Sequence, residues 1–154
     1  MRDLVKIMDT LDHGNGSIIS SDGYIVTNYH VISQGKNMRV KSHNDRSFPI
    51  SIVRYDPECD LALVKIDTTN LKTFNLNLNK DLVGENIYVA GTPKDTLLSN
   101  GISGGIISGQ RTHHNVRYLQ TDAAINSGNS GGGMVLQDGT MAGIINSKFS
   151  GYGI

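Results

Sequence analysis

The chain has 154 residues and a single cysteine, so no disulfide can form within it. Its 14 Lys and Arg equal its 14 Asp and Glu, and this lack of a basic excess argues against a nucleic-acid-binding protein. No block of like charges predicts a membrane-surface patch. No apolar run approaches the roughly 18 residues that a membrane-spanning helix requires. The N-terminal stretch MRDLVKIMDT has an acidic residue at position 3 and no apolar core, so we expect no signal peptide there.

Charged residues are also scarce, at 18% of the chain, where about a quarter is usual. Glycine, by contrast, accounts for 18 of the 154 residues, which is above the average share of about 7%. Glycine-rich, charge-poor chains with many short apolar runs are typical of all-β proteins. The length suits a single domain or two very small ones, and it suffices to bury a core without disulfides or metals.

Apolar residues recur with a period near two along most of the chain, which predicts β-strands. We predict eleven, at residues 4–8, 16–20, 24–28, 38–42, 49–55, 61–66, 86–91, 101–108, 116–121, 132–137 and 141–146. Turn sequences separate them, and QDGT predicts a tight hairpin between the last two. Helical turns are expected only at HVIS, after the strand 24–28, and at 93–98. So many short strands indicate barrels or a sandwich, and the polar stretch 71–80 is the expected connection between two small barrels.

One serine, Ser130, lies within the glycine run GNSGG, which fits the G-x-S-x-G motif of α/β-hydrolases. In that fold a helix follows the serine directly and the catalytic histidine comes later in the chain. Here the strand-like GGGMVLQ follows, and all five histidines precede the serine. A phosphate-binding loop is disfavoured as well, because G-x-x-x-x-G-K-[ST] is absent and no helix begins after the glycines. The alternative that remains is the chain order His, Asp, Ser.

His30 is the histidine best placed to act as a base in that order. It closes the strand YIVTN and begins a short apolar turn, whereas His13, His43 and the pair His113-His114 lie in polar turn segments. The pair is interpreted as part of a solvated turn rather than a metal site, because no partner spacing supports a metal.

Asp60 is the acid best placed to orient that histidine. It directly precedes the alternating run LALVKI and should be buried, while Asp56 and Glu58 lie in the preceding turn and should be exposed. Taken alone, each candidate is explained by a structural role. Together, Ser130, His30 and Asp60 supply the nucleophile, base and orienting acid of acyl transfer. The adjacent Cys59 is interpreted as a small, half-buried residue.

Three segments together resemble the trypsin-like serine proteases of the HtrA/DegP type, namely TNYHVI (27–32), DLALVKID (60–67) and TDAAINSGNSGGG (121–133). The likeness also covers GSIISSDGYIVTN (16–28), GTP (91–93) and SNGISGGIISG (99–109), so it extends over most of the chain in the same order. It implies a chymotrypsin-like double β-barrel with the site in the cleft between barrels. The N-terminal barrel would span about 1–72 and the C-terminal barrel about 79–154.

The resemblance implies a serine endopeptidase that cleaves unfolded or exposed polypeptide segments and uses no cofactor or metal. His30 would be the general base, Asp60 its orienting acid and Ser130 the nucleophile. The backbone N–H groups of Gly128 and Ser130 would form the oxyanion hole, and Asn129 would contribute through the bend that aims them.

Further positions carry over by analogy to the substrate-binding region. Ala124 lies six residues before the serine, at the position that sets primary specificity in trypsin-like enzymes. A preference for Lys or Arg is therefore not expected, and a small or medium apolar pocket is. Ile145 and Asn146 would lie on the substrate-binding edge. Because Asn129 is uncharged, activation through pairing with a newly cut N-terminus is not expected.

The sequence departs from the family pattern at Gly133, where a proline is usual, and at SGYGI (150–154), beyond which family members add a strand and often a PDZ domain. We therefore expect the second barrel to lack its last strand within these residues and to leave a sheet edge open. This departure favours an alternative, a catalytically latent peptide-binding or chaperone-like module on the same fold. The family also implies a homotrimer, although the N-terminal segment lacks the aromatic cluster that supports it, and members are mostly periplasmic or organellar.

Overall fold

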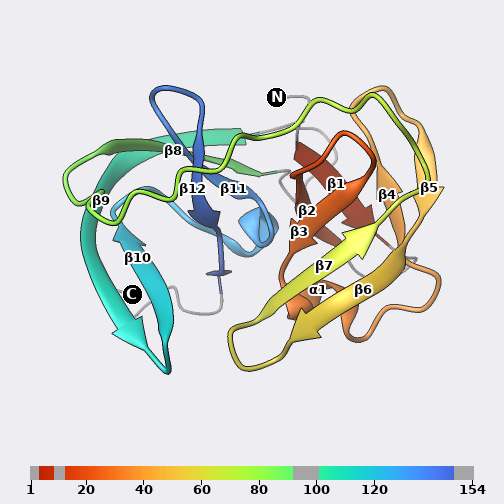
Figure 1. Ribbon diagram of the computed structural model, residues 1–154, viewed down its shortest axis with the longest axis horizontal. Helices are drawn as coiled ribbons and strands as arrows, with labels where there is room; N and C mark the ends of the chain where they lie inside the picture. The colour runs from red at the N-terminus through yellow and green to blue at the C-terminus, as the bar shows by residue number, and fades with distance from the viewer. Residues whose placement is uncertain (1–3, 9–12, 92–100, 148–154) are drawn as a thin grey trace.

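The computed structural model describes residues 4–8, 13–91 and 101–147, and it is almost entirely β-structure (Figure 1). Its strands are β1 (Leu4–Met8), β2 (His13–Ile18), β3 (Tyr24–Thr27), β4 (Arg39–Lys41), β5 (Ser47–Pro49), β6 (Ser51–Asp56), β7 (Leu61–Lys65), β8 (Asn86–Gly91), β9 (Gly101–His113), β10 (Val116–Thr121), β11 (Gly133–Leu136) and β12 (Met141–Ile144). Two helical turns, α1 (Tyr29–Ile32) and η1 (Ser127–Asn129), interrupt them. Within the described ranges, no helix has the length and apolar character to cross a membrane.

The first seven strands form one antiparallel sheet in the order β5-β4-β1-β2-β3-β7-β6. Strands β5 and β6 lie at opposite ends of this order, yet only Ile50 separates them in sequence. The sheet must therefore curl until its two edges meet, which makes a barrel. Alternate residues point inward, as in β7, where Ala62 and Val64 are buried, and the interior holds a contiguous aliphatic core.

The remaining five strands form a second antiparallel sheet in the order β10-β9-β8-β11-β12, curled over a core of its own. Figure 1 shows this sheet on the left, facing the first sheet on the right. Within the described residues, β10 and β12 are its two edges. The hairpin between β11 and β12 is the one predicted from QDGT, with Gly139 at φ +86°.

The stretch 71–80 runs from the first sheet to the second (Figure 1). On the first sheet, the Phe74 N–H donates to the Ile18 carbonyl at 3.0 Å. On the second sheet, the Asn77 N–H donates to the Met141 carbonyl at 2.9 Å. Phe74 also packs with Val135 and Met141 in a small buried cluster. The connection therefore fastens the two sheets together.

Most predicted strands occur within a few residues of the predicted bounds, but the strand predicted at 49–55 is wrong as a single element. It is divided at Ile50, because β5 pairs with β4 while β6 pairs with β7. The helical turn after His30 is confirmed as α1, and the one predicted at 93–98 lies outside the described residues.

Candidate active site

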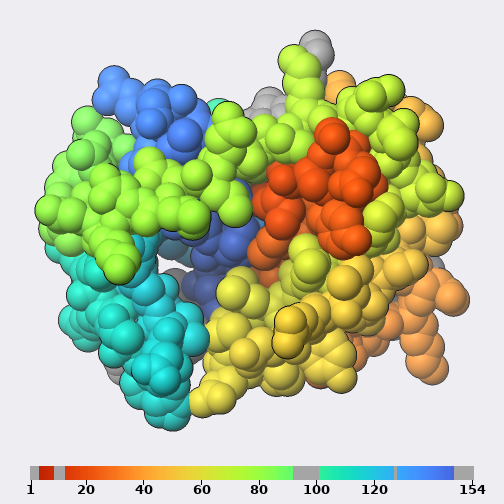
Figure 2. Space-filling view, in the orientation of Figure 1, coloured from red at the N-terminus to blue at the C-terminus, as the bar shows by residue number. Residues whose placement is uncertain are grey.

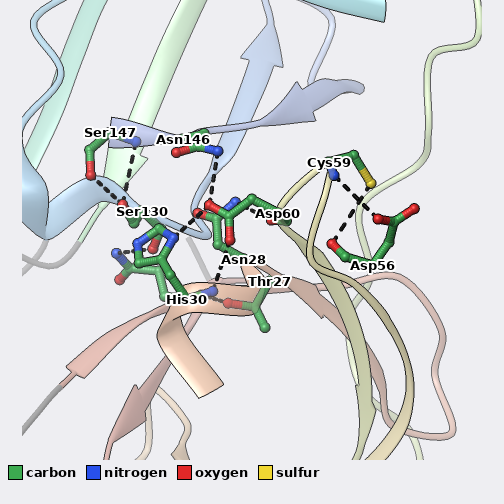
Figure 3. A network of polar contacts seen from close by, with 10 residues as sticks. Thr27, Asn28, His30, Asp56, Cys59, Asp60, Ser130, Asn146 and Ser147 are labelled. Atoms are coloured by element: carbon green, nitrogen blue, oxygen red, sulfur yellow. Dashed lines mark hydrogen bonds and ion pairs between the residues drawn. The ribbon is translucent and has the colours of Figure 1, made fainter. Parts of the chain in front are cut away.

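His30 and Asp60 meet because their strands are neighbours. Strands β3 and β7 pair with Thr27 opposite Ala62, so the residues just after β3 lie beside those just before β7. His30 Nδ1 lies 2.6 Å from Asp60 Oδ2, and the His30 backbone N–H donates to Asp60 Oδ1 at 2.8 Å (Figure 3). The carboxylate thus holds both the ring and the backbone of the histidine.

Asp60 is itself held firmly, and its carboxylate is buried with 6% of the residue exposed. Its backbone has φ +55°, a left-handed conformation that Asp and Asn tolerate better than other side chains. Its carbonyl accepts the Tyr29 N–H at 3.1 Å and the Asn28 side-chain amide at 3.0 Å. From the second sheet, Asn146 Nδ2 donates to Asp60 Oδ2 at 2.9 Å. A carboxylate in this setting keeps the proton on His30 Nδ1 and leaves Nε2 as the acceptor.

Ser130 follows η1 and is almost fully buried, with 2% exposed. Its backbone carbonyl accepts the Asn15 N–H of β2 at 2.9 Å, so the serine is joined to the first sheet. The next residue, Gly131, has φ +83°, and its N–H donates to the Ile145 carbonyl at 3.0 Å. A Cβ on Gly131 would lie 1.9 Å from the Asn15 carbonyl oxygen, so only glycine fits. The serine is therefore fixed at the junction of the two sheets.

The structure brings His30, Asp60 and Ser130 into one site, but the Ser130 hydroxyl is directed to Ser147 (Figure 3). The two hydroxyls are hydrogen-bonded, and the Ser147 N–H donates to Ser130 Oγ at 3.4 Å. No hydrogen bond joins this hydroxyl to the His30 ring in the part of the chain that the structure describes.

The two N–H groups implied as oxyanion donors lie in or beside η1. Ser130 is the buried C-cap residue of η1. The Gly128 N–H donates to the side-chain oxygen of Asn126 at 2.9 Å. The Asn129 N–H also donates to Asn126, through the backbone carbonyl at 3.0 Å. The Gly128 N–H is therefore capped by the Asn126 side chain.

A cavity of about 290 Å³ opens beside these residues, between the two edges of the second sheet and the turn before β7. Figure 2 shows a hollow at this place, where cyan, blue and yellow segments meet. Its walls include Ile125, Met134, Ile145 and Asn146, so two of the predicted substrate-binding residues line it. The third, Ala124, is exposed, and its carbonyl accepts from the Ser103 hydroxyl at 2.8 Å.

The thiol of Cys59 lies at the same cavity, next to Asp60. Burial raises its pKa above the ordinary thiol value, and the hydrogen bond to Asp56 acts in the same direction. The pKa of Asp56 is lowered in turn, chiefly by the hydrogen bond from the Cys59 backbone N–H. Cys59 therefore stays a protonated thiol at neutral pH and is not a competing nucleophile.

A histidine outside the site also spans the two sheets. His114, at the tip of the β9–β10 hairpin, lies with Nδ1 2.5 Å from Oε1 of Glu58 in the turn before β7. Both side chains are mostly exposed, and His113 stacks on His114 with ring centroids 4.1 Å apart. Such exposed pairs contribute little to stability.

Four polar residues at the site were not foreseen in these roles: Asn15, Asn126, Asn146 and Ser147. Asn146 was expected on the substrate-binding edge, and the structure also joins it to Asp60. The contact of Asn15 with Gly128 spans 113 residues, and no local pattern encodes such a pairing. Asn126 is the one with a local signal, because Asn is a favoured N-cap residue whose side chain accepts the N–H of the second helical residue, here Gly128.

Comparison with known proteins gives consistent matches. The family described as "Trypsin-like peptidase domain" matches residues 14–144. A probable periplasmic serine endoprotease, DegP-like, of Halomonas elongata is 39% identical over 145 residues, covering 91% of this chain and 30% of that protein. The mitochondrial serine protease HTRA2 of Drosophila grimshawi is 37% identical over 150 residues, covering 90% of this chain and 35% of that protein. The chain thus spans about a third of the length of these relatives.

A solved structure, the serine endoprotease from Yersinia pestis, has a TM-score of 0.81 and 36% sequence identity. The alignment covers 93% of this chain and 53% of that one. Together with the two curled sheets, this likeness confirms the predicted all-β, chymotrypsin-like double-barrel fold.

Proposed function

Since the chain belongs to the trypsin-like peptidase family and is of the HtrA/DegP type, we propose that it is a serine endopeptidase. Its substrates are unfolded or exposed polypeptide segments, cleaved through an acyl-enzyme intermediate. The observation that carries the proposal is the pairing of His30 with Asp60 at 2.6 Å, next to a buried serine on a glycine-rich bend. Three residues from separate parts of the chain meet there with the chemistry that acyl transfer needs.

In the proposed reaction, His30 Nε2 takes the proton of Ser130 Oγ as the oxygen attacks the scissile carbonyl. Asp60 stabilises the imidazolium through Nδ1 and is not itself protonated. The tetrahedral intermediate expels the amine, which receives the proton from His30, and leaves an ester on Ser130. Water, activated by the same imidazole, then hydrolyses the ester and regenerates the serine.

The developing negative charge on the carbonyl oxygen requires donors that are already in place. We assign the Ser130 N–H, at the buried C-cap position of η1, as one of these donors. The Gly128 N–H joins it once it leaves Asn126. A preorganised donor of this kind contributes about 3–4 kcal/mol to transition-state stabilisation.

The cavity walls support a preference for a small or medium apolar side chain before the cleaved bond. Ile125, Met134 and Ile145 give the cavity an apolar surface, and the Ile145 carbonyl accepts the N–H of Gly131, the residue after the serine. A charged side chain would have to lose its hydration against these residues.

A second candidate, a catalytically latent peptide-binding module, is favoured by two contacts of the site. Ser147 holds the nucleophile away from His30, and Asn126 caps one oxyanion donor. Both contacts would have to change before turnover. In this alternative they do not change, and the cleft only holds extended polypeptide.

Turnover of an unfolded protein separates the two functions. The purified chain is incubated with a reduced, alkylated protein substrate, and newly formed N-termini are counted by mass spectrometry. We expect cleavage by the wild type, none by Ser130→Ala, and much less cleavage of the same substrate in its native fold. If a folded wild-type sample formed no more new N-termini than Ser130→Ala does, the endopeptidase function would be ruled out and peptide binding would remain.

A further inference from the structure

We infer that Asn15, on strand β2 of the first sheet, is a positioning residue that holds the backbone bend carrying the oxyanion-hole N–H groups on the second sheet. The inference rests on the proposed peptidase function and adds a residue to it. Asn15 touches neither substrate nor the reacting atoms in that scheme. It acts through the backbone on either side of the bend that carries Ser130.

The contacts of Asn15 with that bend are direct and buried. The residue is 0% exposed. Its side-chain amide donates to the Gly128 carbonyl at 2.6 Å and to the Ser130 carbonyl at 3.4 Å. Its backbone N–H donates to the same Ser130 carbonyl at 2.9 Å. One residue of the first sheet therefore holds the carbonyl groups of both residues whose N–H groups form the oxyanion hole.

Asn15 is well suited to this task because it is itself rigid. It lies inside β2, which pairs with β1 through the partners Lys6 and Asn15. Its carbonyl accepts the Thr27 hydroxyl of β3 at 2.6 Å. The close approach of Gly131 packs the bend directly against the Asn15 backbone. A side chain on a paired strand holds its partners more precisely than one on a loop.

Anchoring the carbonyl groups has an electrostatic consequence for the reaction. A peptide group is planar, so the held Gly128 and Ser130 carbonyls fix the peptides 128–129 and 130–131, which flank the peptide 129–130 that carries the Ser130 N–H. If the Gly128 carbonyl were released, the peptide 129–130 could rotate and turn the Ser130 N–H away from the point where the oxyanion develops. The neutral amide of Asn15 is the described side-chain donor that prevents this turn. Asn126 acts on the same bend through its N–H groups, because it accepts the Gly128 N–H at its side chain and the Asn129 N–H at its backbone carbonyl.

The test compares two buried substitutions on the same strand. Asn15→Leu removes the donor and keeps a side chain of similar size. Ser17→Ala is the matched control, because Ser17 is also 0% exposed and contacts the bend only at the Gly131 carbonyl, at 3.4 Å. For each variant, kcat and KM are measured on a peptide substrate. The kcat is calculated per folded molecule, with the folded fraction taken from thermal unfolding. The affinity for a peptide boronate, which mimics the tetrahedral intermediate, is measured in parallel.

We expect Asn15→Leu to lower kcat on the order of tenfold to a hundredfold, with KM within about twofold, since the defect acts in the transition state. Boronate affinity should fall by a similar factor. Ser17→Ala should change kcat by no more than about twofold. A folded Asn15→Leu variant with wild-type kcat and boronate affinity would overturn the inference alone. A folded wild type without Ser130-dependent turnover would instead overturn the proposed function, and the inference with it.

A second variant covers the case in which Asn15→Leu does not fold. Asn15→Asp keeps the shape, but its carboxyl donates to the Gly128 carbonyl only when protonated, and burial between carbonyl oxygens favours that form. The ratio of its kcat to the wild-type kcat should therefore rise toward one as the pH falls from about 8 to about 5. Taking the ratio cancels the protonation of His30, which both proteins share. A ratio that does not vary with pH would contradict a donor role for position 15.

Discussion

His30 and Asp60 are joined twice, by the ring nitrogen Nδ1 to Oδ2 at 2.6 Å and by the backbone N–H to Oδ1 at 2.8 Å. The register of β3 and β7 brings them together, and Asn146 adds a third donor to the carboxylate from the other sheet. The imidazole is therefore held in one orientation and one tautomer. Its Nε2 is left to accept a proton from the serine of the same site.

Replacing Asp60 by Asn hardly changes the size of the side chain, but it should lower kcat strongly. The amide would donate where the carboxylate accepts, so the proton would move to Nε2 of His30 and the base would be lost. In a triad of this kind the loss in kcat is about 10⁴-fold. Steady-state kinetics measures it, with Asp56→Asn as the matched control, since Asp56 is exposed and bonds only to its own turn. Equal activity of the two variants would show that Asp60 does not orient the base.

Removing the Ser147 hydroxyl should raise the reactivity of the site. In the structure that hydroxyl is hydrogen-bonded to Ser130 Oγ, so Ser147→Ala frees the nucleophile to turn to His30. A single neutral hydrogen bond is worth about 1 kcal/mol, which corresponds to a rise of roughly fivefold in the rate of fluorophosphonate labelling. Ser147→Thr keeps the hydroxyl and serves as the control. A slower rate in Ser147→Ala than in the control would assign Ser147 a supporting role instead.

Cys59 should react slowly with iodoacetamide at neutral pH. Burial raises its pKa, so the folded protein binds this proton more tightly than a free thiol does, and the thiolate appears only at higher pH. The pH profile of alkylation should therefore lie at higher pH than that of a cysteine-containing peptide, and unfolding should abolish the difference. Profiles that coincide in the folded state would contradict the burial of this thiol at the cavity.

Gly131→Ala should destabilise the fold more than Gly139→Ala. The two glycines have nearly equal φ, +83° and +86°, so both substitutions carry the same left-handed penalty of about 1–2 kcal/mol. Only at Gly131 does the new Cβ meet another atom, the Asn15 carbonyl oxygen at 1.9 Å; around Gly139 there is nothing within 4 Å. Urea unfolding should show an additional loss of about 2 kcal/mol or more at Gly131. Equal losses in the free energy of unfolding for the two variants would mean that the two sheets can move apart around the new Cβ at little cost in free energy.

The sequence allowed much of this arrangement to be predicted because local patterns encode it. The period of two in the apolar residues marks most strands, and the order His, Asp, Ser with strand-like residues after Ser130 separates this site from an α/β-hydrolase. Asp60 could be expected to be buried because it precedes an alternating run, and it is. The break at Ile50 could not be predicted, since it depends on which strands pair with β5 and β6.

The details that control the site depend on contacts between distant residues. Asn15 lies 113 residues from Gly128, and Asn146 lies 86 residues from Asp60. Neither asparagine stands out in its own segment, because a buried polar side chain is recognised only once its partners are known. The direction of the Ser130 hydroxyl is likewise a property of the assembled site, where Ser147 comes within reach. The boundary proposed between the barrels, at about 72–79, stays a prediction.

The identity of the nucleophile is the central claim, and the position of a covalent adduct tests it most directly. The folded chain is treated with a fluorophosphonate, digested, and the modified peptide is sequenced by tandem mass spectrometry. Because two serine hydroxyls meet at the site, the fragment ions must separate Ser130 from Ser147. We predict one adduct, on Ser130, that is lost in Ser130→Ala and greatly slowed in His30→Ala. An adduct on Ser147, or none on a folded chain, would contradict the account.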